Sequence, residues 1–272
     1  MNTRHIPSSG EALPVIGLGT YKGFDTAAGS TKYGQLPAVL GALFAAGGSV
    51  IDSSPMYGRA EAAVGSLLGA AAHPKPFLAT KVWTRGRDAG IAQMQRSMAL
   101  MGTACIDLMQ VHNLVDCKVH LATLRAWKQA GRVRYIGVTH YTSSAYAELE
   151  AVLRSEPLDF VQLNYSVADR GTEQRLLPLA AERGIAVLAN LPLGSGGALQ
   201  AVLHRKLPDF AVELACSSWS QLLLKFVLAH PAVTCAIPGT GDPAHMADNA
   251  LAGVGPLPDS AMRERIAATF SG

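Results

Sequence analysis

The chain has 272 residues, of which 49% are hydrophobic and 16% are charged, and its formal net charge is +3. A disordered chain has the opposite balance, and scattered basic residues do not favour a nucleic-acid or membrane partner. The length fits one large domain or two small ones. Residues 1–10 are polar, without the apolar segment of a signal peptide, and no apolar run is long enough to span a membrane. We therefore expect a cytoplasmic protein.

The chain begins with a predicted β-hairpin, after which short apolar runs follow one another. The hairpin pairs Arg4–Ile6 with Ala12–Pro14 around a turn at Ser9-Gly10. The apolar runs are rich in Val, Ile and Leu with little polar alternation, which is typical of strands buried on both faces. These predicted strands are Val15–Gly19, Ser49–Asp52, Phe77–Lys81, Ile106–His112, Tyr135–Thr139, Phe160–Tyr165, Ala186–Leu191 and Val233–Pro238.

Amphipathic stretches typical of helices follow these runs. They are Gln35–Ala46, Ala60–Ala71, Ala89–Met101, Val119–Ala130, Ser144–Arg154, Glu173–Glu182, Ala211–Ala229 and a short one, Pro243–Ala252. Eight strand–helix units in this length predict an α/β fold, the (β/α)8 TIM barrel, with a doubly wound open sheet as the alternative. We expect a single barrel domain over residues 1–272. Its N-terminal hairpin (1–14) would plug the bottom of the barrel, and residues 243–272 would form C-terminal helices.

In a barrel of this kind, reactive side chains follow the C-terminal ends of the strands. Tyr57 lies in the loop five residues beyond Asp52. Asp52, Tyr57, Lys81 and His112 should therefore meet at the mouth of adjacent strands. The polar residues at the predicted strand ends are Asp52, Lys81, His112, Thr139, His140, Gln162 and Asn164.

These four side chains suit the reduction of a carbonyl group. A carboxylate keeps the Lys81 ammonium charged and fixed, and a cation near a phenol lowers a pKa that starts near ~10. Tyr57 is then expected to donate a proton at neutral pH, while His112 hydrogen-bonds the carbonyl oxygen that receives it. The carbonyl carbon would take a hydride from a nicotinamide.

The sequence around these residues resembles the aldo-keto reductase family. The resemblance implies the barrel, a nicotinamide cofactor and an oxidoreductase that acts reversibly on the CH–OH group of donors. It makes Tyr57 the general acid, with Lys81, Asp52 and His112 as its partners. The motifs that carry it are Gly17-Leu18-Gly19-Thr20-Tyr21, Ile51 to Gly58, Ala79-Thr80-Lys81, Asp107 to Asn113, Arg134 to Thr139, and Ile237 to Thr240 followed by His245 to Asn249.

The resemblance also implies where the cofactor and the substrate bind. Tyr21, Tyr57, Trp83 and His112 would line the substrate pocket, which takes a small carbonyl or alcohol. The residues expected at the cofactor are Gly19, Thr20, Tyr21, Asp52, Thr139, His140, Gln162, Asn190, Leu191, Leu193, Gly194, Pro238, Gly239, Thr240, His245, Asp248 and Asn249.

Two positions at the expected nicotinamide depart from the family pattern. The family often has Ser-Asn where this chain has Thr139-His140, which keeps the hydroxyl and changes the second contact. An aromatic residue often stacks on the nicotinamide at the position held here by Asn190.

The segment expected to bind the adenosine phosphate departs as well. Relatives that prefer NADPH usually place Lys or Arg there, whereas this chain has Gly239 and Gly241, and His245 is its one basic residue. The helix predicted to start at Asp242-Pro243 offers free N–H groups, but the Asp242 carboxylate would repel a phosphate. We expect NADP(H), with NAD(H) as the alternative.

Two other functions stay open: a catalytically weak, cofactor-binding regulatory barrel, and a Schiff-base lyase with Lys81 as nucleophile. Gly17-Leu18-Gly19 is predicted to be a tight turn because no helix pattern opens after it. The segment Gly194–Gly197 would cradle a pyrophosphate or form a flexible loop.

No metal site is predicted, since the sequence has neither an HExxH motif nor a cysteine cluster. His120, His204 and His230 are expected to be solvated or capping residues. We expect a monomer or a weak homo-oligomer.

Overall fold

In the computed structural model, which describes residues 1–271, strands and helices alternate along the chain. The strands are β1 (Thr3–His5), β2 (Ala12–Pro14), β3 (Leu18–Gly19), β4 (Val50–Asp52), β5 (Phe77–Val82), β6 (Ile106–His112), β7 (Val133–His140), β8 (Phe160–Asn164), β9 (Ala186–Asn190) and β10 (Val233–Ala236). The helices are α1 (Thr31–Ala45), α2 (Ala60–Ala70), α3 (Arg87–Leu100), α4 (Cys117–Gln129), α5 (Tyr146–Ser155), α6 (Leu176–Glu182), α7 (Gly197–Gln200), α8 (Trp219–Leu228), α9 (Pro243–Leu251) and α10 (Ser260–Ser271).

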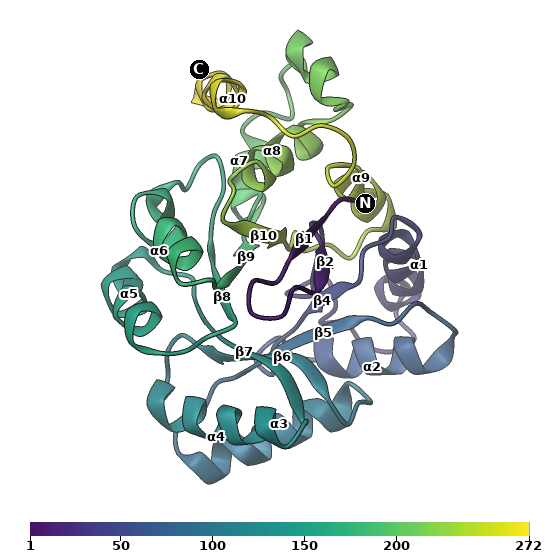
Figure 1. Ribbon diagram of the computed structural model, residues 1–272. Coiled ribbons are helices and arrows are strands. Elements are labelled where there is room, and N and C mark those ends of the chain that lie inside the picture. The colour runs from purple at the N-terminus through teal and green to yellow at the C-terminus, as the bar shows by residue number, and fades with distance from the viewer. Residues whose placement is uncertain (272) are drawn as a thin grey trace.

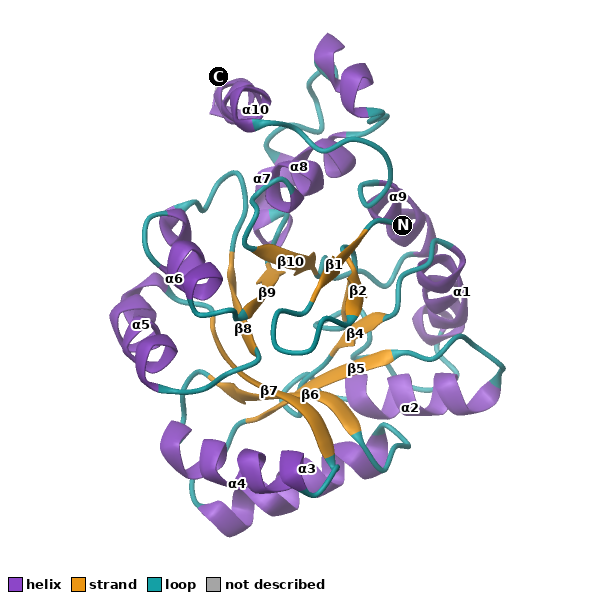
Figure 2. Ribbon diagram, viewed as in Figure 1, coloured by secondary structure: helices purple, strands orange, loops and turns teal. Residues whose placement is uncertain are grey.

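Strands β3 to β10 form one parallel sheet in chain order, and the sheet closes on itself. Parallel bridges join Ile16 to Ala236 and Gly19 to Gly239. A Cβ on Gly19 would lie 3.0 Å from the carbonyl oxygen of Ile237, so glycine permits the close approach that closes the ring. The predicted (β/α)8 barrel is confirmed, and the open-sheet alternative is wrong. Figures 1 and 2 show the helices arranged around the ring of strands.

The hairpin of β1 and β2 plugs one end of the barrel, as predicted. Ile6 and Leu13 are buried with the residues that fill the barrel interior, among them Phe77 and Phe160. Figure 1 shows the hairpin across the middle of the ring. Glu11 fastens it by accepting hydrogen bonds from the Tyr135 hydroxyl, at 2.6 Å, and from Arg134.

Helices α1 and α8 begin at serine residues that cap them. Ser30 accepts a hydrogen bond from the N–H of Tyr33 at the start of α1, and Ser218 accepts one from Gln221 at the start of α8. The predicted helix over Ala211–Ala229 is therefore wrong in its first part. The chain turns at Ala215, where φ is +52°, and only the part after Ser218 is α-helical.

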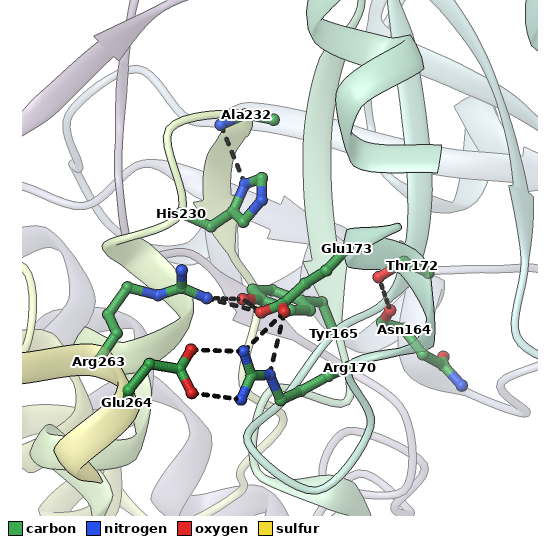
Figure 3. Close-up of polar contacts among 9 residues, drawn as sticks. All are labelled: Asn164, Tyr165, Arg170, Thr172, Glu173, His230, Ala232, Arg263 and Glu264. Carbon is green, nitrogen blue, oxygen red and sulfur yellow. Dashed lines mark hydrogen bonds and ion pairs between the residues drawn. The ribbon is translucent and has the colours of Figure 1, made fainter. Parts of the chain in front are cut away.

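Helix α10 is attached to the barrel by a cluster of charged groups (Figure 3). Glu173 accepts hydrogen bonds from the Tyr165 hydroxyl and from Arg263 of α10, which is 2.6 Å away. Arg170 joins Glu173 to Glu264, with 2.7 Å between Arg170 Nη2 and Glu264 Oε1. Because Tyr165 directly follows β8, this cluster ties the C-terminal helix to the end of that strand. The last residue of the expected helical range, 272, lies outside the described residues.

Within residues 1–271, every helix falls short of the length and apolar character that a membrane crossing needs. All four cysteines are free thiols.

Candidate active site

The side chains that point into the barrel change from apolar to polar along each strand. In a strand, alternate residues share one face. Phe77 and Ala79 of β5 and Leu108 of β6 belong to the apolar interior, so Lys81 and His112 follow them on the same face. The same alternation places Asp52 after Val50 in β4. The C-terminal ends of adjacent strands thus carry a polar layer above the apolar core, as predicted.

Asp52 and Lys81 form an ion pair at the centre of this layer. Lys81 Nζ donates to Asp52 Oδ2 at 2.6 Å and to the carbonyl oxygen of Ser53 at 2.7 Å. Gln110 Nε2 donates to the other carboxylate oxygen of Asp52 at 3.2 Å. Lys81 is 0% exposed and Asp52 is 2% exposed, so the pair is shielded from water. Burial opposes the charge on Lys81, but Asp52 and Tyr57 together outweigh it and raise the pKa of the ammonium above its ordinary value.

Tyr57 lies in the loop after β4, beside this pair. Lys81 Nζ is 5.0 Å from the centroid of the Tyr57 ring, and the ring of His112 meets it edge-on at 6.3 Å. Burial raises the pKa of the Tyr57 phenol above its ordinary value, and the charge of Lys81 only partly offsets this. Lys81 lowers the pKa of Tyr57 as expected, but the net shift is upward, so the expected net lowering does not occur. The phenol is desolvated as well as close to a cation, and desolvation is the larger effect.

His112 is held as a neutral imidazole. Burial, followed by the charge of Lys81, lowers the pKa of His112 to about 3. Its Nδ1 lies 3.2 Å from the hydroxyl of Ser54. The N–H of Met56 donates to that hydroxyl oxygen at 3.4 Å, which leaves the hydroxyl hydrogen free for Nδ1. With Ser54 as the donor to Nδ1, the proton of the neutral His112 ring lies on Nε2.

Aromatic rings surround this group on the solvent side. Tyr21 lies 5.0 Å from Tyr57, and Trp83 lies 6.5 Å from His112, measured between ring centroids. Tyr21 and Trp83 are both exposed. The four residues predicted to line the substrate pocket are therefore brought together.

The neighbouring strands carry polar groups that lack partners. His112 pairs in register with Thr139, Thr139 with Gln162, and Asn164 with Asn190, so the polar layer continues around the barrel. Gln162 Nε2, Asn164 Oδ1 and Asn190 Oδ1 are buried without a hydrogen-bond partner among the described residues. The other polar groups of Asn164 have partners: Nδ2 donates to the carbonyl oxygen of Tyr141. The backbone carbonyl oxygen of Asn164 accepts from the Thr172 hydroxyl, a contact drawn in Figure 3. Buried unpartnered donors and acceptors of this kind suit the carboxamide of a nicotinamide.

The loops next to this layer contain most of the other residues expected at the cofactor. The Thr20 hydroxyl is occupied within the fold, donating to the carbonyl oxygen of Asp52 at 3.0 Å and to Ser53. Leu191 and Gly194 have positive φ, and Leu193 lies between them. The segment Gly194–Gly196 forms a turn of 3₁₀-helix that leads into α7. His140 accepts a hydrogen bond from the N–H of Thr142 at 3.2 Å. Pro238, Gly239 and Thr240 follow β10, and Gly239 lies against Gly19.

Helix α9 differs from the expected phosphate-binding helix. The Asp242 carboxylate caps this helix, accepting from the N–H groups of Ala244 at 2.7 Å and His245 at 3.2 Å. Those two groups are therefore not free for a phosphate, contrary to the expectation of open N–H groups there. Asp248 accepts from Ser218 and Gln221, and Asn249 accepts from Ser220, so both side chains hold α8 in place. The side chain of His245 is exposed.

The sequence did not single out Ser54 or Gln110, which contact His112 and Asp52. Gln110 shares a strand face with His112, so strand alternation is the signal that would have found it. The expectation for His120 was wrong: it is fully buried, and its Nε2 lies 2.7 Å from the carbonyl oxygen of Thr84. Among residues 1–271, no three His, Cys, Asp or Glu side chains gather as a metal site.

Comparison with known proteins agrees with this geometry. Residues 15–267 match the profile of the Aldo/keto reductase family. Methylglyoxal reductase YeaE of Escherichia coli (strain K12) is 29% identical over 259 residues, which cover 92% of this chain and 89% of that protein. A crystal structure of aldo/keto reductase from Klebsiella pneumoniae in complex with NADP and acetate has a TM-score of 0.81 and 26% identity, covering 96% of this chain and 93% of that one. A Klebsiella pneumoniae aldo-keto reductase in complex with NADPH has a TM-score of 0.83 and 26% identity, covering 99% and 96%.

Proposed function

The chain belongs to the aldo/keto reductase family, and on that premise we propose that it is an NADP(H)-dependent carbonyl reductase with Tyr57 as its general acid. Its substrate is a small aldehyde or ketone. The observation that supports this most directly is the convergence of Tyr57, His112 and the buried Asp52–Lys81 pair at one end of the barrel. The cofactor assignment is supported by the structural relatives with bound NADP and NADPH.

Bound NADPH supplies the hydride, and the protein supplies the proton and the polar surroundings. Gln162, Asn164 and Asn190 would hold the nicotinamide through their unpartnered polar atoms. Held in this way, the ring would be oriented toward the substrate. Positioning of this kind turns the encounter of two reactants into a step within one complex.

Tyr57 carries the proton that the reduced oxygen receives. Because burial raises the pKa of its phenol, Tyr57 keeps this proton at neutral pH until charge develops on the substrate oxygen. The Lys81 ammonium then stabilises the phenolate left behind, and Asp52 keeps that ammonium charged. In the reverse direction the same phenolate would take a proton from an alcohol.

His112 binds the carbonyl oxygen as a neutral donor. Ser54 occupies its Nδ1, so Nε2–H is the group available to the substrate. A neutral imidazole beside Lys81 adds no further positive charge to the site.

The proposal is tested by cofactor binding and turnover in one series. The purified protein should bind NADPH with fluorescence quenching and consume it with methylglyoxal, the substrate named for the E. coli relative. NADH titrated under matched conditions measures the preference between the two nucleotides. Absence of NADPH oxidation across a panel of aldehydes and ketones, despite tight NADPH binding, would favour the regulatory barrel instead.

A Schiff-base lyase requires Lys81 as a neutral amine. The contact with Asp52 argues against this, since it raises the pKa of Lys81 and keeps the group charged. Borohydride added with a carbonyl substrate should therefore leave Lys81 unlabelled. A covalent adduct at Lys81 in a peptide map would favour the lyase.

A further inference from the structure

Trp83 stands at the substrate mouth on a short loop that lies outside the sheet. Strand β5 ends at Val82, and α3 begins at Arg87. Trp83 is 42% exposed, and its ring lies 6.5 Å from that of His112, the residue expected to hold the substrate oxygen. A substrate bound beside His112 would therefore touch this indole, and the position of the loop would decide how well it fits.

Three side chains from two neighbouring helices hold the backbone of this loop. Gln93 of α3 binds both polar groups of Trp83: Oε1 accepts from its N–H at 2.6 Å, and Nε2 donates to its carbonyl oxygen at 3.2 Å. His120 Nε2 donates to the carbonyl oxygen of Thr84 at 2.7 Å. Asp116 Oδ2 accepts from the N–H of Gly86 at 2.7 Å.

The backbone and the packing of α3 and α4 accommodate these contacts. Asp116 and His120 are one helical turn apart at the start of α4, so they face the loop together. A Cβ on Gly90 of α3 would lie 2.4 Å from Cε1 of His120, so only glycine leaves room for the imidazole between the two helices. Asp116 has φ +46°, a left-handed backbone that Asp tolerates better than most residues. A strained residue and a fully buried histidine thus support a loop that is otherwise exposed.

We propose that Gln93, Asp116 and His120 are positioning residues that fix Trp83 as a preset aromatic wall of the substrate mouth. Together with Tyr21 and Tyr57, this wall makes the site favour flat, aromatic carbonyl compounds over small aliphatic ones. A wall fixed before binding costs less ordering when the substrate arrives, so it acts mainly on substrate affinity. The substrate preference rests on the proposed reductase function, whereas the fixing of Trp83 does not.

The fixing of Trp83 is tested without turnover, by fluorine NMR of protein labelled with fluorotryptophan. Trp83→Phe assigns the Trp83 resonance, and the buried Trp127 and Trp219, which are 7% and 6% exposed, serve as internal references. Gln93→Met, which keeps the side-chain length and removes both hydrogen bonds, should shift or broaden the Trp83 line alone. Gln95→Met, at an exposed position of the same helix, should leave all three lines unchanged.

Asp116 supplies a rescue test. Asp116→Gly keeps the left-handed backbone but removes the acceptor, so it should disturb the Trp83 line, whereas Asp116→Asn keeps an acceptor and should restore it. A Trp83 line that stays unmoved in both Gln93→Met and Asp116→Gly would overturn the proposal.

Kinetics with a matched pair of aldehydes then test the substrate preference. Benzaldehyde and acetaldehyde differ by a phenyl in place of a methyl group, and the wild-type protein should have the higher kcat/KM for benzaldehyde. Gln93→Met loosens the loop by removing both of its hydrogen bonds to Trp83, and we expect a rise of about fivefold in KM for benzaldehyde, which corresponds to about 1 kcal/mol. The kcat, NADPH affinity and acetaldehyde parameters should not change. Equal effects on both aldehydes would contradict the preference. If the wild-type protein reduces neither aldehyde nor any other carbonyl compound, the proposed reductase function is wrong. The NMR experiments then still test whether Gln93, Asp116 and His120 fix Trp83.

Discussion

Replacing Asp52 by Asn removes one charge from a buried ion pair while keeping its shape. Lys81 would keep the carbonyl oxygen of Ser53, 2.7 Å away, and an amide oxygen in place of the carboxylate. Breaking a buried pair by removing one partner costs about 3–5 kcal/mol. Because the amide still accepts a hydrogen bond, we expect the lower end, about 3 kcal/mol. That loss corresponds to a fall in Tm of roughly 6–12 °C for a domain approaching this size.

The pH dependence of this loss identifies its cause. In the wild-type protein Asp52 raises the pKa of Lys81 above 10.5, so the stabilisation is complete below 10.5 and is lost only as the pH rises through the raised value. In Asp52→Asn, burial dominates and lowers the pKa of Lys81, so the folded variant prefers the neutral amine. Its stability should rise as the pH approaches 10.5, and the difference from wild type should narrow between pH 7 and pH 10.

Urea unfolding at several pH values measures this difference. The matched control is Glu61→Gln, because Glu61 is also buried and accepts from Thr80, but forms no ion pair within residues 1–271. The control should show no narrowing at alkaline pH. A loss of stability in Asp52→Asn that is the same at pH 7 and pH 10, or no loss at all, would refute the reasoning.

Three further predictions concern other charged groups. Burial lowers the pKa of His112 from 6.5 to about 3, so the wild-type protein loses stability as the pH falls between these values. In urea unfolding, His112→Gln should lose less stability than wild type between pH 7 and pH 4. Equal losses in the two proteins would contradict the neutral imidazole. Arg263→Met removes the contact of α10 with Glu173, so it should lower the free energy of unfolding by about 1–3 kcal/mol and speed amide exchange in α10. Replacing the exposed Arg265 by Met should do neither. Equal exchange rates in the two variants would mean that the cluster does not hold the helix. Asp242→Asn keeps a cap on α9 and removes a negative charge. At low salt the ratio of NADPH affinity to NADH affinity should therefore rise about two- to fivefold, whereas the control Asp209→Asn should leave this ratio unchanged. An unchanged ratio in Asp242→Asn would place the 2′-phosphate elsewhere.

The barrel and the place of its candidate catalytic residues could be predicted because both follow from strand periodicity. Each buried strand is a short apolar run. Asp52, Lys81 and His112 lie at or next to the ends of β4, β5 and β6, where strand alternation directs their side chains into the barrel mouth. Alternation also predicts the place of Gln162, which follows Phe160 on the inner face of β8. The start of α8 was not readable, since Ala211–Leu214 has helical composition and the left-handed turn at Ala215 carries no sequence signal.

What the sequence could not give depends on burial and on contacts between helices. The direction of the pKa shift of Tyr57 follows from how far the ring is desolvated, and the tertiary packing alone decides that. His120 looked like a surface residue because nothing near it in the chain shows that Gly90 leaves space for its ring. The N–H groups of α9 are a different case, because Asp242, which adjoins them in the chain, is itself the cap that occupies them.

The most direct measurement is the single-turnover rate of Tyr57→Phe with NADPH and a carbonyl substrate, together with the NADPH dissociation constant. Removing one hydroxyl should lower the rate of reduction by roughly 10²–10⁴ while leaving NADPH affinity unchanged, because the phenol delivers the proton and does not hold the nucleotide. Reduction at the wild-type rate by this variant would show that the proton comes from another group.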